Sequence, residues 1–460
     1  MRSLAFCLLA AAACGGDPSH TIADAQPADA PDAAPPCAPT TVVGTHAGNI
    51  TADETWATGV HEVTGTVTVR GGTLTIAACT EVRLAPKASI EVTTGTALVA
   101  NGTDSAPIRF VRDNAAQPWG HLSAIAPATL TLAHSTLVGG GTAGDYTTAD
   151  QLGSMITVRG SAALPALLAV DTVTVDGASG IGVFMNGARF TPASTNIVIV
   201  RSSSYPILLG ADSASELPNG SYTGNGIDAI LLQSAGTAAA YEQGRILLAD
   251  VTLHDRGVPY QVGVKPATII VGDGVNGSPS EKLTIEPGVT MAFVPQGTSN
   301  TSRLQVRGHA DGSGQGALVA VGTAAKPIVF TSSAATPAAG DWQGLEFRNA
   351  VSAATSVDHA QIEYAGGASF SVGVCESDPA SHAFKEDSAV LISLEPNIVP
   401  PPFLTNTAIS DSANAGVYRG WSVNAVDFMA TNTFTNVVGC LQSNVPNASN
   451  ACPTTTCPIN

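Results

Sequence analysis

The fold is decided by a series of short apolar runs between Leu283 and Gly367. They read KLTIEPGVTMAF from Lys282, RLQV from Arg303, GALVAVGTAAKPIVFTS from Gly316, GDWQGLEF from Gly340 and SVDHAQIEYAGG from Ser356. The runs are rich in Val, Ile, Leu and Thr, and Gly, Pro, Asn or Asp closes each of them. This pattern predicts many short β-strands joined by tight turns.

The same series occurs once earlier in the chain. TLTIAACTEVRL (73–84), ALVANGTDSAPIRF (97–110) and TLTLAHSTLVGGG (129–141) match the runs at Lys282, Gly316 and Ser356. The offset between the two copies drifts only from 209 residues at Leu74 and Leu283 to 223 residues at Trp119 and Trp342. The sequence therefore predicts a duplicated all-β array.

Composition favours one all-β architecture over the others. The 460 residues are 44% hydrophobic, 12% charged and only 5% aromatic, with 47 Gly. Small and β-branched side chains suit stacked layers, so we predict a right-handed parallel β-helix solenoid with coils of roughly 20–25 residues. A β-sandwich and a propeller are the alternatives, since both use short strands. Consecutive apolar residues within the runs and turns of irregular length favour the solenoid.

Net charge restricts the partners. The chain has 36 acidic and 19 basic residues, for a formal net charge of -17. We expect no nucleic-acid partner, because phosphates call for a basic surface. The same surplus argues against electrostatic docking on anionic lipid.

The N-terminus resembles a lipoprotein signal. Arg2 precedes the apolar run Leu4–Ala13, which is too short to span a membrane. The small residues before Cys14 resemble the bacterial lipobox, in which the Cys is acylated, although Ala11 stands where Leu is commoner. We therefore predict a signal peptide, lipidation of Cys14 and an outer-membrane or cell-surface location; the alternative is an ordinary signal that is cleaved elsewhere.

Five segments are expected along the chain. They are the signal peptide (1–13), the lipidated Cys with a disordered Ala/Pro/Asp spacer (14–36), the first β-helix half (37–260), the second half (261–443) and a Cys-rich C-terminal tail (444–460).

Cysteine usage agrees with export. Of 8 Cys, the signal removes Cys7 and the acyl chains occupy Cys14, which leaves 8 - 2 = 6. The disulfide candidates are Cys37, Cys79, Cys375, Cys440, Cys452 and Cys457. We predict Cys37–Cys79, and of the three pairings open to the other four we favour Cys375–Cys440 with Cys452–Cys457. No metal site is predicted, because no second Cys/His pair stands at zinc-like spacing from Cys452 and Cys457.

The succession LTIEPGV, GALVAVGTAAKPIVFTS, GDWQGLEF and HAQIEYAGG resembles the parallel β-helix repeats of bacterial surface lipoproteins. The lipobox followed by the spacer is similar to lipoproteins of deltaproteobacterial type. The resemblance covers about Thr41 to Ser443. It implies an architecture and an address in the cell envelope, but no activity, because β-helices host both carbohydrate enzymes and passive binders.

The acidic residues are the candidates for an enzyme site. β-Helix pectin hydrolases carry NTD, DD, GHG and RIK segments, and none of these occurs here. Lyases of that fold hold calcium with stacked acids, which Asp171, Asp176, Asp250 and Asp255 could imitate. Calcium belongs to this enzyme alternative alone, and otherwise no cofactor is expected.

The remaining motifs have structural explanations that we favour. GDGVNG (272–277) precedes another strand, so a tight turn is expected instead of a dinucleotide site. His134 and His359 occupy matching positions and are expected at coil corners, bonded to a neighbouring turn. His309 with Asp311, and Glu376 and Asp378 with His382, are expected to be solvated loop residues and not cation ligands. Trp119, Trp342, Tyr364 and Trp421 could stack on sugars, but the correspondence of Trp119 and Trp342 favours a repeated structural plug.

The sequence thus favours a non-enzymatic, lipid-anchored envelope module that contacts polysaccharide or a surface protein. The alternative is a polysaccharide-active enzyme of the pectin lyase-like fold, and a purely structural spacer is the third hypothesis. No catalytic residue is assigned.

Overall fold

The computed structural model describes residues 37–141, 153–161, 163–233, 245–247, 249–277, 279–297, 301–309, 311, 316–369, 387–394, 398–421, 425–446 and 457. The chain from Cys37 onward forms one compact unit. The predicted signal peptide, lipidation site and spacer fall on residues 1–36, outside the described residues.

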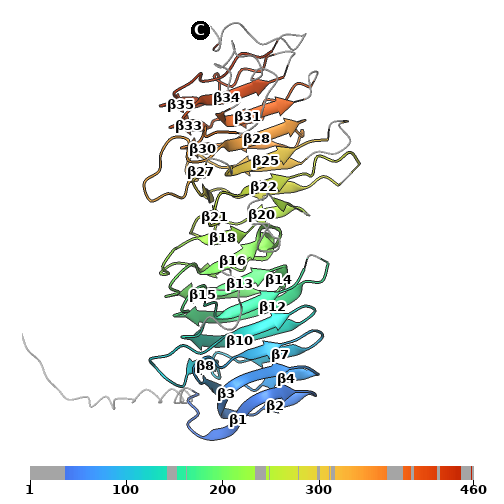
Figure 1. Ribbon diagram of the computed structural model, residues 1–460, viewed down its shortest axis with the longest axis vertical. Coiled ribbons are helices and arrows are strands. Elements are labelled where there is room, and N and C mark those ends of the chain that lie inside the picture. The colour runs from blue at the N-terminus through green and yellow to red at the C-terminus, as the bar shows by residue number, and fades with distance from the viewer. Residues whose placement is uncertain are drawn as a thin grey trace, which may run out of the picture. The chain divides into compact units, whose positions relative to one another are not determined.

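The chain is a parallel β-helix, as the sequence predicts. Short strands of one coil pair in parallel with strands of the coils before and after it, so that the coils stack in chain order (Figure 1). The strands form five ladders, which we name A to E. Ladders A, B and C make a 24-stranded sheet, ladder D has six strands and ladder E has five.

The coils form two blocks that meet at β18 (Ile230–Gln233). In the first block each coil runs through ladders A, B and C in turn. Ladder A contains β2 (Glu54–Trp56), β4 (Thr73–Ile76), β7 (Ala97–Asn101), the first halves of β10 (Thr129–Val138) and β12 (Ala166–Asp176), and β14 (Ala188–Phe190). Ladder B contains the first halves of β1 (Val42–Ile50) and β3 (Gly59–Val69), β5 (Thr80–Leu84), β8 (Ile108–Arg112), the second halves of β10 and β12, β15 (Thr195–Val200) and β17 (Gly220–Ser221).

Ladder C runs through both blocks. It contains the second halves of β1 and β3, β6 (Ile90–Val92), β9 (Leu122–Ile125), β11 (Ile156–Arg159), β13 (Val183–Asn186), β16 (Ile207–Gly210), β18 (Ile230–Gln233), β21 (Tyr260–Val262), β24 (Thr290–Phe293), β27 (Ile328–Ser332), β30 (Ala360–Glu363), β33 (Ala408–Ser410) and β35 (Thr433–Thr435).

In the second block each coil runs through ladders E, C and D. Ladder D contains β19 (Arg245–Ile246), β22 (Thr268–Val271), β25 (Arg303–Arg307), β28 (Gly344–Asn349), β31 (Ser388–Leu394) and β34 (Ala415–Gly420). Ladder E contains β20 (Val251–Leu253), β23 (Lys282–Ile285), β26 (Ala317–Val321), β29 (Ser356–Asp358) and β32 (Leu404–Thr405). GDGVNG lies between β22 and β23, so it is a turn between strands, as expected.

The two blocks meet by an exchange of ladders at β18. This strand pairs with β16, the last strand of its coil, and on its other edge with β21, the middle strand of the next. Ladder B ends at β17, and ladder D begins at β19. The short 3-10 helix η2 (Ala211–Glu216) spans the junction, where the Ser215 hydroxyl accepts the backbone N–H of Thr252 at 2.8 Å. Pairing is therefore unbroken between the blocks, and the half boundary placed after Tyr260 falls within β21.

Aliphatic and aromatic side chains stack through the whole core. The ladder C register aligns Val67, Ile90, Leu122, Ile156, Val183, Ile207, Ile230, Tyr260, Met291, Phe330, Ile362, Ile409 and Phe434. All of these except Phe434 are buried. Burying one such side chain is worth about 1.5–3 kcal/mol, so the continuous column is a large source of stability.

Trp119 and Trp342 are buried plugs, as their matching positions predict. The Trp119 indole Nε1 donates to the carbonyl of Val138 at 2.8 Å, and Trp342 makes the matching bond to Glu363 at 2.8 Å. Phe293 stacks on Trp342 with ring centroids 4.3 Å apart. The duplication has therefore preserved both the ring and its hydrogen bond.

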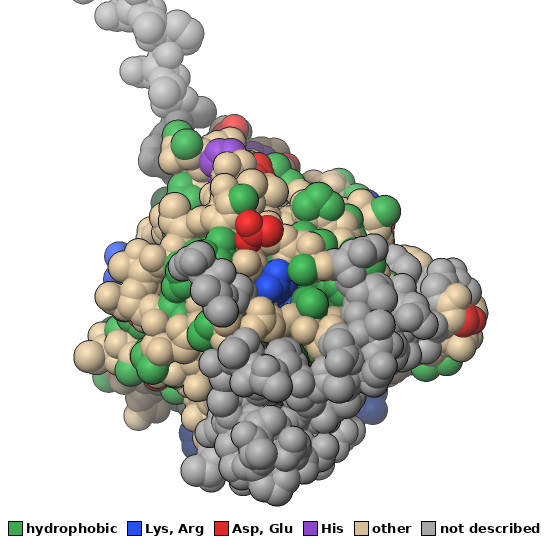
Figure 2. Space-filling model, turned by 90° about the horizontal axis from the view of Figure 1, so that it is seen from above, with side chains coloured by type: hydrophobic (Ala, Val, Ile, Leu, Met, Phe, Trp, Pro, Cys, Tyr) green, Lys and Arg blue, Asp and Glu red, His purple; other side chains and the backbone are tan. Residues whose placement is uncertain are grey.

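Different side chains cover the two ends of the core: an aromatic stack at one end and an arginine at the other. At the N-terminal end Trp56 is buried and stacks on His46 and His61, at centroid distances of 4.0 and 5.3 Å. At the C-terminal end Arg419 stands in register with core residue Ile392, and its guanidinium donates to the carbonyls of Ser443 (2.6 Å) and Val426 (2.8 Å). Figure 2 looks onto this end and shows isolated charged side chains among uncharged ones.

One predicted disulfide is confirmed and the favoured C-terminal pairing is wrong. Cys37 bonds to Cys79, with Cα atoms 5.5 Å apart. Cys440 bonds to Cys457, which rules out both Cys375–Cys440 and Cys452–Cys457. The bond closes 17 residues of chain back onto the last coil, a proximity that sequence spacing does not reveal. Cys375 and Cys452 lie outside the described residues.

The N-terminal cap should make stability depend on pH. His46 Nε2 lies 2.8 Å from His61 Nδ1, and His61 Nε2 lies 2.7 Å from the carbonyl of Ala57. Because the carbonyl only accepts, neutral His61 carries its proton on Nε2, so His46 donates to it. Burial lowers the pKa of His46 below its usual 6.5, and repulsion from His61 lowers it further, against the opposing effect of Glu54.

The unfolded chain therefore binds a proton more readily than the folded chain. We predict that stability is highest above pH 6.5, falls as the pH drops from 6.5 to the lowered pKa of His46, and levels off below it. Thermal unfolding between pH 4.5 and 8 measures this slope, and His46→Gln should flatten it. An identical pH slope in the wild type and His46→Gln would contradict the assignment.

Candidate functional site

The four candidate acids for calcium or catalysis do not converge. Asp171 and Asp176 lie on β12, whereas Asp250 and Asp255 flank β20 on the far side of the junction. Each faces a basic side chain: the partners are His134 at 4.0 Å, Arg201, Lys282 at 3.4 Å and Lys326 at 3.2 Å, respectively. The stacking that the enzyme alternative would require is not found for these four acids, because the coil after β12 sets Thr195 and Val200 beside Asp171 and Asp176.

The repeated histidines are corner residues, as expected, but only the contact of His134 reaches a neighbouring turn, whereas His359 contacts the residue before it. His134 and His359 both have positive φ, 42° and 49°, at the bend between two strands of one coil. His134 Nδ1 lies 2.8 Å from Asp104, and His359 Nδ1 lies 2.8 Å from Asp358. His309 corrects another expectation: it is fully buried, not solvated, with Nε2 3.5 Å from Asp273.

The other candidates are settled as far as the structure describes them. Trp421 is buried like Trp119 and Trp342, so none of the three offers a face to a sugar. Asp311 is exposed. Glu376, Asp378 and His382 lie outside the described residues. Within the described ranges no group of three His, Cys, Asp or Glu side chains is placed to hold a metal ion, and no described helix has the length and apolar character to cross a membrane.

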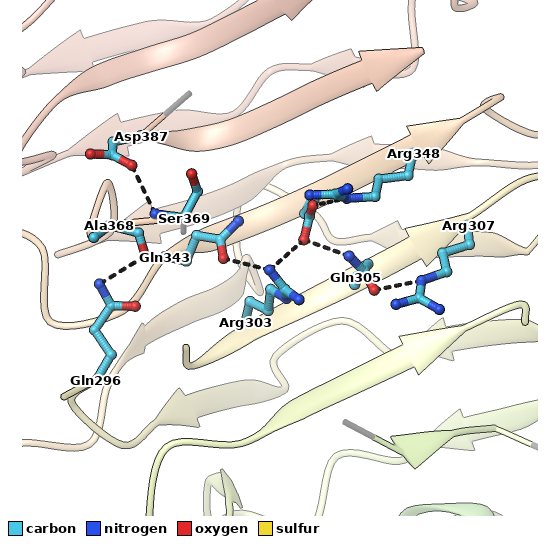
Figure 3. Close-up of polar contacts among 10 residues, drawn as sticks. Gln296, Arg303, Gln305, Arg307, Gln343, Arg348, Ala368, Ser369 and Asp387 are labelled. Carbon is cyan, nitrogen blue, oxygen red and sulfur yellow. Dashed lines mark hydrogen bonds and ion pairs between the residues drawn. The ribbon is translucent and has the colours of Figure 1, made fainter. Parts of the chain in front are cut away.

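A dense polar cluster lies on the outward side of ladder D. Strand alternation places Leu304 and Val306 of β25 in the core, together with Leu345 and Phe347 of β28. The residues between them point the other way, and the register sets Gln305 beside Glu346 and Arg307 beside Arg348. We call the following group the arginine cluster: Arg303, Gln305, Arg307, Gln343, Glu346 and Arg348 (Figure 3).

Three donors meet the single carboxylate of the arginine cluster. Glu346 Oε2 accepts from Gln305 Nε2 at 2.7 Å and lies 3.1 Å from Arg303 Nη1. Glu346 Oε1 accepts from Arg348 Nε. The Glu346 side chain has no exposed surface, while those of Arg303 and Arg348 are 18% and 33% exposed. The cluster thus has a buried acidic centre and a basic rim that reaches solvent.

The side-chain acceptors of the cluster are all occupied, but its donors are not. Gln305 Oε1 accepts from Arg307 Nε at 2.6 Å, and Gln343 Oε1 accepts from Arg303 Nη1 at 3.0 Å. Arg303 Nε and Gln343 Nε2 are buried and have no hydrogen-bond partner in the described chain. The terminal nitrogens of Arg307 bond to no other described residue. The cluster therefore has unused donors and no unused side-chain acceptor.

Like charges are crowded at this site. The three guanidinium groups and one carboxylate of the cluster give 3 - 1 = +2 in a chain of net charge -17, and Asp273 lies close enough to offset part of the charge of Arg307. Burial lowers the pKa of Arg303 and of Arg307. Glu346 opposes this effect for both, repulsion from Arg348 adds to it, and Asp273 opposes it for Arg307. A further negative group would relieve both the repulsion and the shortage of acceptors.

This geometry suits binding better than acid–base chemistry. A general acid or base must have a free oxygen within hydrogen-bond reach of the reacting group. Both oxygens of Glu346 are held by neighbouring side chains, and the carboxylate is buried beneath them. The arginine cluster can hold a ligand through N–H groups, but it offers no free carboxylate.

Comparison with protein-family models and with curated proteins finds no match to this chain.

The arginine cluster was missed at the sequence level, although a signal for it exists. RLQVR (303–307) alternates polar and apolar residues, which sets Arg303, Gln305 and Arg307 on one face. Glu346 and Arg348 alternate in the same way within GLEFRN (344–349). The sequence does not show that these two strands are neighbours, since 40 residues separate Arg303 from Gln343.

We predict that Glu346→Gln destabilises the protein by about 3 kcal/mol, because it leaves three buried or half-buried guanidinium groups without their counter-charge. Asp250→Asn is the matched control: its ion pair with Lys282 is exposed and should be worth about 0–1 kcal/mol. Urea unfolding of both variants measures the difference. Equal stability of the two would show that Glu346 does not hold the cluster together.

Proposed function

We propose that the protein is a lipid-anchored envelope module that binds a glycan through the arginine cluster without performing chemistry on it. The observation that carries the proposal is the surplus of N–H donors around one fully engaged carboxylate on the outward face of β25 and β28. Hydroxyl and carboxylate oxygens of a glycan are the acceptors that such a surface lacks.

The proposed location of the protein in the cell envelope rests on separate observations. The run Leu4–Ala13 and Cys14 favour export and acylation, and the Ala/Pro/Asp composition of residues 15–36 favours a spacer between the membrane and the β-helix. The disulfides Cys37–Cys79 and Cys440–Cys457 support an oxidising compartment outside the cytoplasm.

Acylation at Cys14 can be tested directly. Expressed in a bacterium from its own N-terminus, the chain should enter the membrane fraction and incorporate a clickable palmitate analogue. Cys14→Ala should lose the label and its membrane association, because one cysteine carries all the acyl chains. Cys7→Ala is the control and should keep both. Label that persists in Cys14→Ala would place the acyl group elsewhere.

Binding without turnover is the second expectation. The full-length chain in detergent should bind at least one glycan on an array, and Arg348→Gln should weaken that binding about tenfold or more, because a charged hydrogen-bond donor is lost. Arg109→Gln removes an exposed arginine far along the chain from the cluster and should leave binding unchanged.

The same glycans, incubated with the protein with and without calcium, should release no reducing ends and no unsaturated products. Turnover would replace the proposal with the polysaccharide-active alternative. Absence of binding to every glycan would leave the protein as a structural spacer.

A further inference from the structure

We propose that the arginine cluster recognises a single carboxylate group on an otherwise neutral glycan, a uronic acid within a neutral chain. This inference rests on the proposed glycan binding and names the chemical class of the ligand. The free donors of the site, its local charge and the charge of the whole protein each contribute to it.

The unused donors form an anion-binding set. Arg307 is half-buried, and its Nε is fixed by Gln305, so both terminal nitrogens remain for a ligand. A guanidinium offers parallel N–H groups whose spacing matches the two oxygens of a carboxylate. Partial burial strengthens such a pair, because the effective dielectric constant is lower than in water.

Gln343 supplies a neutral donor at the other end of the cluster, beside Arg303 and at least four strand positions from Arg307. Its side chain is 1% exposed, and its Nε2 has no hydrogen-bond partner in the described chain. A buried amide N–H without a partner is unfavourable, so an acceptor at this position is worth more than the same contact at the surface. Because this donor lies at the Arg303 end, the acceptor would come from a neighbouring neutral sugar of the chain and not from the uronic acid that Arg307 holds.

Overall charge selects against a densely charged ligand. The cluster carries +2, but the chain carries -17. A polyanion that follows the surface beyond a Debye length, about 8 Å at physiological ionic strength, meets mainly repulsion. One carboxylate within a neutral glycan is attracted to the cluster, and the neutral remainder of the glycan is not repelled by the acidic surface. The charge balance therefore favours a sparsely charged glycan over a homopolyuronate.

A matched pair of ligands tests the inference. Aldotetraouronic acid carries one glucuronate on neutral xylotriose, and xylotriose alone is the uncharged counterpart. Calorimetric titration of the full-length protein should show Kd at least about tenfold lower for the acidic sugar, corresponding to one charged hydrogen-bonded pair. Polygalacturonate should bind more weakly per uronate than the aldotetraouronic acid.

Variants tie the effect to the site. Arg307→Gln should abolish the preference for the acidic sugar. Arg307→Lys, which keeps the charge but loses the parallel N–H donors of the guanidinium, should reduce it. Arg109→Gln removes the same charge elsewhere and should change nothing. Thermal unfolding of each variant checks its fold. If Arg307→Gln is unstable, Arg307→Lys still tests the guanidinium, because it retains the aliphatic part of the side chain and the charge.

The outcomes separate the two proposals. Equal affinity for both sugars, or equal loss in Arg307→Gln and Arg109→Gln, would overturn carboxylate recognition at the cluster and leave glycan binding standing. If neither these sugars nor any glycan on the array binds, the proposed function itself fails.

Discussion

Stacking of each coil on its neighbours is the constraint on which the whole structure depends. A short strand buries one face, and a single coil cannot cover that face by itself. Register therefore has to hold from coil to coil, and the column from Val67 to Phe434 shows that it does, across the exchange of ladders at β18. The ends of such a column need special treatment. Trp56 with its two histidines covers one end, and the guanidinium of Arg419 satisfies carbonyl groups at the other.

This constraint acts on the inward residues and leaves the outward ones free. Strands of adjacent coils lie about 4.8 Å apart, so outward side chains from two coils can meet without any change to the core. The arginine cluster uses this freedom: Leu304, Val306, Leu345 and Phe347 maintain the core, while their alternate neighbours assemble the cluster. The buried carboxylate of Glu346 would be costly alone, and the donors that surround it make it tolerable. A polar site can therefore be added to a solenoid at little cost in core packing.

The sequence was most informative where the answer depends on local pattern. Short strands, the duplication, the Trp119 and Trp342 plugs and the Cys37–Cys79 bond could all be predicted from it. It was least informative about which coil lies beside which. The two-residue alternation of a strand assigns each residue to the inward or the outward face. The lengths of the loops determine which residue of the adjacent coil lies beside it. The exchange of ladders at β18, the Cys440–Cys457 bond and the meeting of Arg303 with Glu346 all depend on such neighbours. The burial of His309 was missed for the same reason.

The duplication shows how far the outward face can diverge. The register of β6 with β9 matches that of β25 with β28, so Ile90 and Leu122 correspond to Leu304 and Leu345, and both pairs are buried. The outward positions of the first copy that correspond to the arginine cluster are occupied by Ser89, Glu91, Thr93, Gly120, Ser123 and Ile125. None of these is an arginine, and Glu91 is negative where Gln305 is neutral. The core requirement has kept the two copies alike, whereas the cluster belongs to the second copy alone. Outward positions that the core leaves free can diverge in this way, and the proposed recognition site lies in the copy that carries the arginines.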